Sequence, residues 1–98
     1  MDAREREDQN IGWHLKWLVR PDGWVVITNG GWVPASYKER KEMLKQLRHI
    51  ENMIKRFGLK GWIIPELIYH IEMQGIIEKL GGRPYAIVDN EILYYKEV

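Results

Sequence analysis

The sequence predicts one α+β domain, in which two helices pack against a mostly antiparallel β-sheet. Two stretches of alternating apolar and polar residues flank turn residues, one near the start of the chain and one near its end, as is typical of β-hairpins. Between them lies a long apolar stripe at helical spacing, followed by a short apolar segment. The strand, helix and strand in the middle of the chain predict one parallel β-α-β crossover.

The length and composition of the chain are those of a single globular domain. It has 98 residues, of which 45% are hydrophobic and 30% are charged. We expect residues 1–11, which are polar, to form a flexible arm and residues 12–98 to form the domain. The chain has no cysteine, and its three histidines show no metal-ligand spacing, so we expect neither a disulfide nor a metal site.

The charge balance and the apolar runs limit the partners and the location. Fifteen Lys and Arg residues against fourteen Asp and Glu residues give a net charge of +1, which argues against nucleic acid as a partner. The apolar runs are too short to cross a membrane, and the charged first residues lack the apolar core of a signal peptide. We therefore expect a cytoplasmic protein with no membrane partner.

The first hairpin is expected around the turn Arg20-Pro21-Asp22-Gly23. Before this turn, apolar residues recur at every second position, at Trp13, Leu15, Trp17 and Val19. Residues 24–28 form the returning strand, which Asn29-Gly30-Gly31 ends. Because exposed aromatic side chains usually mark contacts, Trp13, Trp17 and Trp24 predict a surface for self-association or for a protein partner.

A long helix is expected from Ser36 to Phe57. Ser36 and Glu39 have the spacing of a capping box, and Gly58 is a natural helix stop. The apolar stripe consists of Met43, Leu47, Ile50, Ile54 and Phe57. The opposite face carries Lys38, Lys41, Lys45, Arg48 and Lys55. This basic face is either an ordinary solvated surface or a stripe for nucleic acid or for the phosphates of coenzyme A.

The remaining elements are a strand, a helix and a second hairpin. Residues 59–64 are short, apolar and bounded by Gly58 and Pro65, which indicates a buried strand. A second helix is expected from Glu66 to Leu80, where two glycines end it. Residues 83–88 and 91–97 predict an antiparallel hairpin around Asp89-Asn90.

This order of elements resembles the GNAT superfamily of acyl-CoA N-acetyltransferases, from the fourth strand of that fold to its end. Residues 33–38, Val-Pro-Ala-Ser-Tyr-Lys, match the step from a strand into the cofactor loop and the long helix. The closest match is residues 77–82, Ile-Glu-Lys-Leu-Gly-Gly, with the hairpin that follows, including Arg83-Pro84-Tyr85 and Tyr94-Tyr95-Lys96. The resemblance covers residues 24–98 and implies a reduced GNAT-like fold.

The resemblance implies an acetyl-CoA-dependent N-acyltransferase that acts on an amine acceptor. Acetyl-CoA would bind where the strand leads into the helix, at Val33, Ala35, Ser36, Lys38, Arg40 and Lys41. Two features depart from the family: residues 38–43 contain no glycine, and Ile77 stands at the place of the tyrosine that protonates the departing thiolate. We expect Glu66 to act as the general base, with Tyr69 or His70 in place of the missing acid.

Two other functions stay open. The missing loop glycines and Ile77 also favour a non-enzymatic interaction or structural module on the same scaffold. Small proteins of this reduced kind are encoded by phages, which implies a viral source and a location in the host cytoplasm or the virion. A reduced fold leaves a sheet face or edge uncovered, which predicts a homo-oligomer or a protein partner.

The third function is nucleic-acid binding by a winged helix over residues 36–98. Its first helix would be the long one, two short helices would meet near Gln74-Gly75, and the wing would lie at Asp89-Asn90. The recognition helix, residues 74–80, would carry a single base, Lys79, which disfavours this architecture for a phosphate-lined groove.

Overall fold

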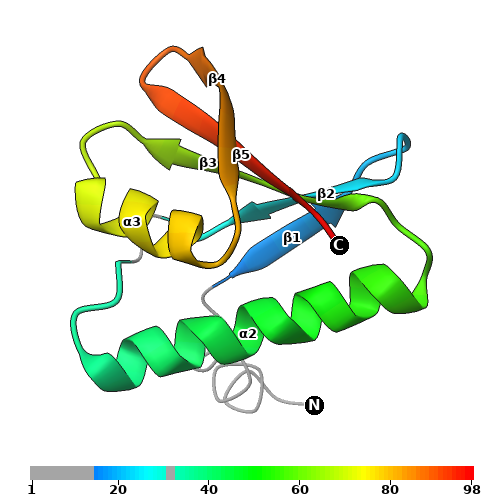
Figure 1. Ribbon diagram of the computed structural model, residues 1–98, viewed down its shortest axis with the longest axis horizontal. Coiled ribbons are helices and arrows are strands. Elements are labelled where there is room, and N and C mark those ends of the chain that lie inside the picture. Colours follow the sequence, from blue (N-terminus) through cyan, green and yellow to red (C-terminus); the bar gives the residue numbers. More distant parts are fainter. Residues whose placement is uncertain (1–14, 31–32) are drawn as a thin grey trace, which may run out of the picture.

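The computed structural model describes residues 15–30 and 33–98. Within them the chain forms five strands and two helices, which Figure 1 shows coloured along the sequence. In chain order these are β1 (Lys16–Val19), β2 (Trp24–Thr28), α2 (Tyr37–Arg56), β3 (Gly61–Leu67), α3 (Ile71–Lys79), β4 (Arg83–Val88) and β5 (Glu91–Glu97). The predicted arm, residues 1–11, and Trp13 lie outside the described residues.

The strands form one sheet in the order β1-β2-β3-β5-β4. Its neighbouring strands are antiparallel except β2 and β3, which are parallel and are joined through α2. This confirms the predicted α+β class, with a mostly antiparallel sheet and one β-α-β crossover. Neither of the two described helices is long and apolar enough to cross a membrane.

Both helices cover the same face of the sheet, and α2 runs below the strands in Figure 1. Side chains alternate between the two faces of a strand, and the alternate residues Val25, Ile27, Trp62, Ile64 and Tyr94 are all buried in one core with α2 and α3. The other face, which carries the side chains between these, is not covered by either described helix.

Helix α2 follows the prediction at its start and along its buried stripe. Ser36 is the N-cap, and its Oγ accepts a hydrogen bond from the backbone N–H of Glu39 over 3.2 Å. Leu47, Ile50 and Ile54 are buried as expected. The prediction for Phe57 was wrong: it is the C-cap residue and is 62% exposed, because Gly58 adopts a φ of +67° and turns the chain out of the helix.

The boundary at Pro65 also differs from the prediction. Strand β3 runs through Pro65 to Leu67, and α3 begins at Ile71 rather than at Glu66. Pairing with β2 stops at Ile63, so the rest of β3 is bonded to β5 alone. Proline is tolerated where a strand is an edge, since no neighbour on that side requires its missing N–H.

Both hairpins form where the sequence predicted them. Strands β2, β4 and β5 have the predicted bounds, and Asp89 in the closing turn adopts a φ of +55°. Helix α3 is continuous through Gln74 and Gly75, and the closing hairpin belongs to the main sheet. The fold is therefore not the winged-helix arrangement.

Candidate functional site

The two parallel strands separate at their carboxyl ends. The last paired residues are Val26 and Ile63, yet β2 continues to Thr28 and β3 to Leu67 (Figure 1). Below this opening, on the helix side, the core side chains close up and leave a cavity of about 10 Å³, too small to hold more than one water molecule. In sheets with parallel strands, ligands bind outside the carboxyl ends where neighbouring strands part. The opening between β2 and β3 is therefore the first candidate site.

Glu66 lies at this opening with its carboxylate buried. The side chain is 4% exposed. Its Oε1 accepts a hydrogen bond from Asn29 Nδ2 over 3.2 Å, which bridges the ends of β2 and β3. Its Oε2 accepts from the backbone N–H of Leu67 over 3.1 Å and lies 3.6 Å from His70 Nδ1. Each carboxylate oxygen of Glu66 therefore has one neutral hydrogen-bond donor, and the imidazole of His70 is the remaining polar group beside it.

His70 is placed by the short connection between β3 and α3. Its backbone N–H donates to the carbonyl of Leu67, and the amide of Gln74 donates to the carbonyls of Leu67 and Ile68, each over about 3.0 Å. The His70 Nδ1 atom is buried and has no hydrogen-bond partner within the structure. The imidazole as a whole is 31% exposed, so one side of the ring faces solvent.

The structure thus brings together two of the three predicted catalytic residues, Glu66 and His70. Tyr69, the third, has a side chain that is 65% exposed and is not buried with them. Asn29 was not predicted, because nothing in the local sequence distinguishes it from an ordinary turn residue. Ile77, at the place of the family's catalytic tyrosine, is buried in the core.

The predicted cofactor residues surround the start of α2. Val33 packs against the core, while Ala35, Ser36, Lys38, Arg40 and Lys41 are exposed. The capping box is complete, since the Glu39 carboxylate also accepts from the backbone N–H of Ala35 over 3.3 Å. Arg40 is paired with Glu72 of α3 over 3.2 Å. Lys41 Nζ lies 5.4 Å from the centre of the Tyr37 ring.

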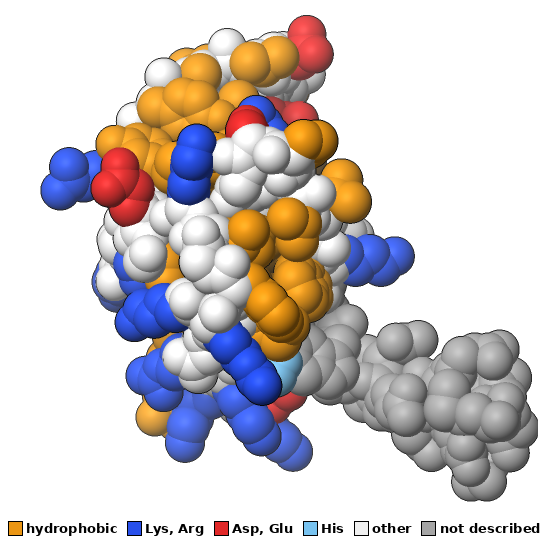
Figure 2. All heavy atoms as spheres, turned by 90° about the vertical axis from the view of Figure 1, so that its right-hand side faces the viewer, with side chains coloured by type: hydrophobic (Ala, Val, Ile, Leu, Met, Phe, Trp, Pro, Cys, Tyr) orange, Lys and Arg blue, Asp and Glu red, His pale blue; other side chains and the backbone are white. Residues whose placement is uncertain are grey.

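Basic side chains follow the outer face of α2. Lys38, Lys41, Lys45, Arg48 and Lys55 are all exposed, and within residues 15–30 and 33–98 none of them forms an ion pair. Figure 2 shows Lys and Arg side chains gathered at the lower end of the molecule, where α2 lies, with hydrophobic side chains above them. Lys38 and Lys41 are the members of this face that lie beside the helix start.

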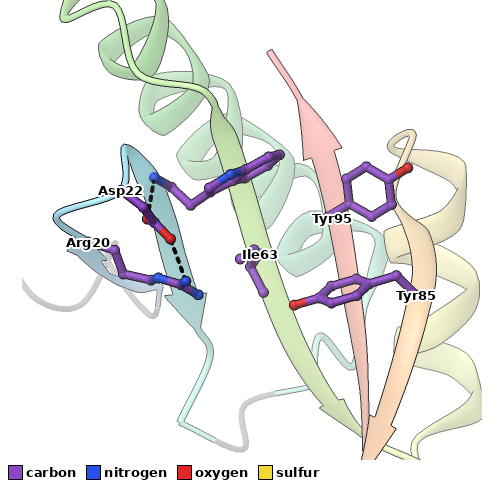
Figure 3. Close-up of a pocket in the computed structure, with 6 residues that line it drawn as sticks. Arg20, Asp22, Ile63, Tyr85 and Tyr95 are labelled. Atoms are coloured by element: carbon purple, nitrogen blue, oxygen red, sulfur yellow. Dashed lines mark hydrogen bonds and ion pairs between the residues drawn. The ribbon is translucent and has the colours of Figure 1, made fainter.

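A second hollow lies on the opposite face of the sheet (Figure 3). It has a volume of about 430 Å³ and is lined by Arg20, Asp22, Trp24, Ile63, Tyr85 and Tyr95. Tyr95 meets both Trp24 and Tyr85 edge to face, with ring centres 6.1 and 5.6 Å apart. Asp22 binds the Arg20 guanidinium and accepts from the backbone N–H of Trp24 over 3.1 Å.

The sequence did not predict this hollow. Its residues come from four strands and a turn, so no local spacing connects them. The predicted hairpin surface is divided instead, because Trp17 pairs with Ile27 of the buried face whereas Trp24 lies on the other face.

Comparison with known proteins gives no match, either to a protein-family model, to a curated protein or to a solved structure.

Proposed function

We propose that the protein is an acyl-CoA-dependent N-acyltransferase in which Glu66 and His70 accept the proton of the amine. The observation that carries this proposal is the pair itself: a buried carboxylate 3.6 Å from an unpartnered, buried imidazole nitrogen. The order of strand, long helix, strand, helix and hairpin agrees with the GNAT resemblance. The pair lies where β2 and β3 part, and the partly exposed His70 ring is the side from which a substrate would approach.

The pair suits the proton transfer that amide formation requires. An amine attacks a carbonyl carbon only as the free base, so a group nearby must accept its proton. A proton taken up at the solvent-facing side of the His70 ring would make it an imidazolium whose buried Nδ1 lies 3.6 Å from Glu66 Oε2, and the carboxylate would stabilise that charge. Bound acetyl-CoA would supply the acetyl group as a thioester, from which the coenzyme A thiolate leaves. The proton lost by the amine equals the one that the released thiol gains, so the reaction balances.

The start of α2 fits the phosphates of the cofactor through side chains rather than through a glycine loop. Lys38 is exposed beside the positive end of the helix dipole, and the Tyr37 ring lies against the ammonium of Lys41. The backbone N–H of Ala35 already donates to the Glu39 carboxylate, so it is not free to bind a phosphate. We therefore assign phosphate binding to Lys38 and Lys41, and we assign Arg40, which pairs with Glu72, a structural role.

Calorimetric titration with acetyl-CoA tests the cofactor site. We expect binding tighter than about 100 µM, which corresponds to about −5.5 kcal/mol. Lys38→Ala should weaken it severalfold, whereas Lys55→Ala, on the same face at the far end of the helix, should leave it unchanged. Absence of heat at millimolar acetyl-CoA, or equal losses in the two variants, would contradict the proposal.

Thiol release from acetyl-CoA with a panel of primary amines tests the chemistry. Glu66→Gln should lower turnover by about 10²–10⁴-fold, the usual contribution of a general base, while acetyl-CoA binding persists. The matched control is Glu91→Gln, an exposed carboxylate on β5. Circular dichroism should show both variants folded. Full activity of the Glu66→Gln variant would exclude Glu66 from the proton transfer.

A further inference from the structure

The sheet face opposite the helices carries a continuous apolar surface, here named the open face. The strand register places Leu18, Val26, Ile63 and Tyr95 in one row across β1, β2, β3 and β5. Neighbouring rows on the same face contribute Trp24 at one side and Pro65, Leu93 and Ala86 at the other. The Tyr85 ring, which is 50% exposed, stands beside Tyr95 (Figure 3).

The open face is apolar like the inner face of a packed sheet, but no described helix packs on it. The parallel pair β2 and β3 lies inside this sheet, and its side chains on the open face, Val26 and Ile63, are apolar. The central Ile63 is only 8% exposed, because the aromatic rings around it partly cover its side chain. No described helix lies over these side chains, so any cover would come from outside residues 15–30 and 33–98.

The rim of the open face carries charges of both signs. The register and the hydrogen bonds place Lys16, Arg20 and Arg83 there with the carboxylates Asp22, Glu91 and Glu97, and a further cation, Lys60, lies near Asp22. A nucleic acid or an anionic membrane would require a larger excess of cations around the apolar centre. Two identical faces with this mixed rim can approach without strong net repulsion.

We propose that a second copy of this chain covers the open face and forms a two-fold symmetric dimer by sheet-on-sheet packing. A two-fold interface uses the same patch on both copies, which the mixed rim and the apolar centre allow. Stacked sheets interdigitate their inner side chains, and the hollow of about 430 Å³ beside Tyr85 gives the partner's side chains a place to enter. This inference is independent of the proposed acyl transfer, because Glu66 and His70 lie at the helix side of the sheet.

The estimated area of the open face indicates a small dimer interface. Five strands about 4.8 Å apart, each contributing about five residues of about 3.3 Å, give a patch of roughly 400 Å² on each copy. The two patches together, roughly 800 Å², correspond to a weak and reversible interface. We therefore expect a dissociation constant in the micromolar range rather than a permanent dimer.

Sedimentation velocity over about 5–500 µM protein tests the dimer. The wild-type chain should shift from monomer to dimer as its concentration rises. Val26→Lys, which places a charge at the centre of the open face, should remain monomeric at about 500 µM. Ile71→Lys is the matched control, since Ile71 is 76% exposed on α3, away from this face, and should dimerise like the wild type.

A second measurement separates a face-specific dimer from loss of folding. The chain has no cysteine, so Thr28→Cys at the open face and Lys55→Cys on α2 each give one labelling site. A short bismaleimide should link the Thr28→Cys variant into dimers and leave Lys55→Cys largely unlinked. A wild-type monomer at every concentration, equal cross-linking of the two variants, or dimers of a folded Val26→Lys chain would each overturn the proposal.

Discussion

The indole N–H of Trp62 donates a 2.8 Å hydrogen bond to Glu51 Oε2, the same oxygen that accepts from Lys96 Nζ over 2.9 Å. This carboxylate joins α2 to both β3 and β5. Because Trp62 is fully buried, Glu51→Ala would leave its N–H without a partner, and we expect a loss of about 1–3 kcal/mol in the free energy of unfolding. Lys96→Met should cost less than about 1 kcal/mol, as partly exposed ion pairs do. Urea denaturation of the two variants measures the difference, and equal losses would contradict this account.

The stripe of α2 can be tested at its centre and at its end. Ile50 is fully buried, whereas Phe57 is 62% exposed. Ile50→Ala should lower the free energy of unfolding by about 2–5 kcal/mol. Phe57→Ala should change it by less than about 0.5 kcal/mol, although both residues lie on the stripe that the sequence predicts. A loss below about half a kcal/mol for Ile50→Ala would show that the buried face is misplaced.

Tyr94 should make stability depend on pH in alkaline solution. Burial, with the Glu78 carboxylate that accepts from the phenol over 3.1 Å, raises the pKa of Tyr94 to about 12. The unfolded chain has a tyrosine pKa of about 10, so the folded state holds the proton more tightly. The contribution is fully present below pH 10 and is lost as pH rises from 10 to 12; its size is about 3 kcal/mol.

Tyr94→Phe is the control for this pH dependence. The two proteins share every other titratable group, so the difference between the two stability curves isolates Tyr94. We expect the advantage of the wild type over Tyr94→Phe to shrink between pH 10 and pH 11.5 in urea denaturation. A constant difference across this range would show that the folded-state pKa is not raised.

Two glycines should respond to alanine in opposite directions. A Cβ at Gly61 would collide with the backbone carbonyl of Lys96 and stand 2.9 Å from the Trp24 ring, so Gly61→Ala should cost about 1–3 kcal/mol or more. A Cβ at Gly75, inside α3, meets nothing within 4 Å, and Gly75→Ala should stabilise the protein by about 0.5–1 kcal/mol. Thermal unfolding distinguishes the two; a drop in melting temperature for Gly75→Ala would argue against the placement of α3.

Elements with local signals were predicted from the sequence, and those that depend on a neighbouring strand were not. The capping box of Ser36 and Glu39 and the turn at Asp89 act within a few residues. The closing hairpin has the predicted bounds, and α2 lies within one residue of them at each end. Pro65 indicated a strand end because proline is a local breaker. It stays within β3 because β2 has already separated from that strand, which no local pattern records.

The candidate site was predicted in part for the same reason. Glu66 and His70 were chosen by position along the chain, and their contact follows from the extension of β3 past Pro65 into a short turn. Asn29, which directly follows β2, contacts Glu66 although all of α2 lies between the two residues in the sequence. The aromatic hollow gathers Trp24, Tyr85 and Tyr95 from three strands, so only the sheet order reveals it.

The parallel crossover has a kinetic consequence. Strands β4 and β5 are joined by a two-residue turn, and such hairpins close in about 1–10 µs. Gly61 pairs with Trp24 only after all of α2 has been placed between them, so loop-closure entropy delays this contact. We expect β3 to join the closing hairpin first and β2 to dock last. Until then one edge of β3 is unpaired, and refolding at high protein concentration should lose material to aggregation through that edge.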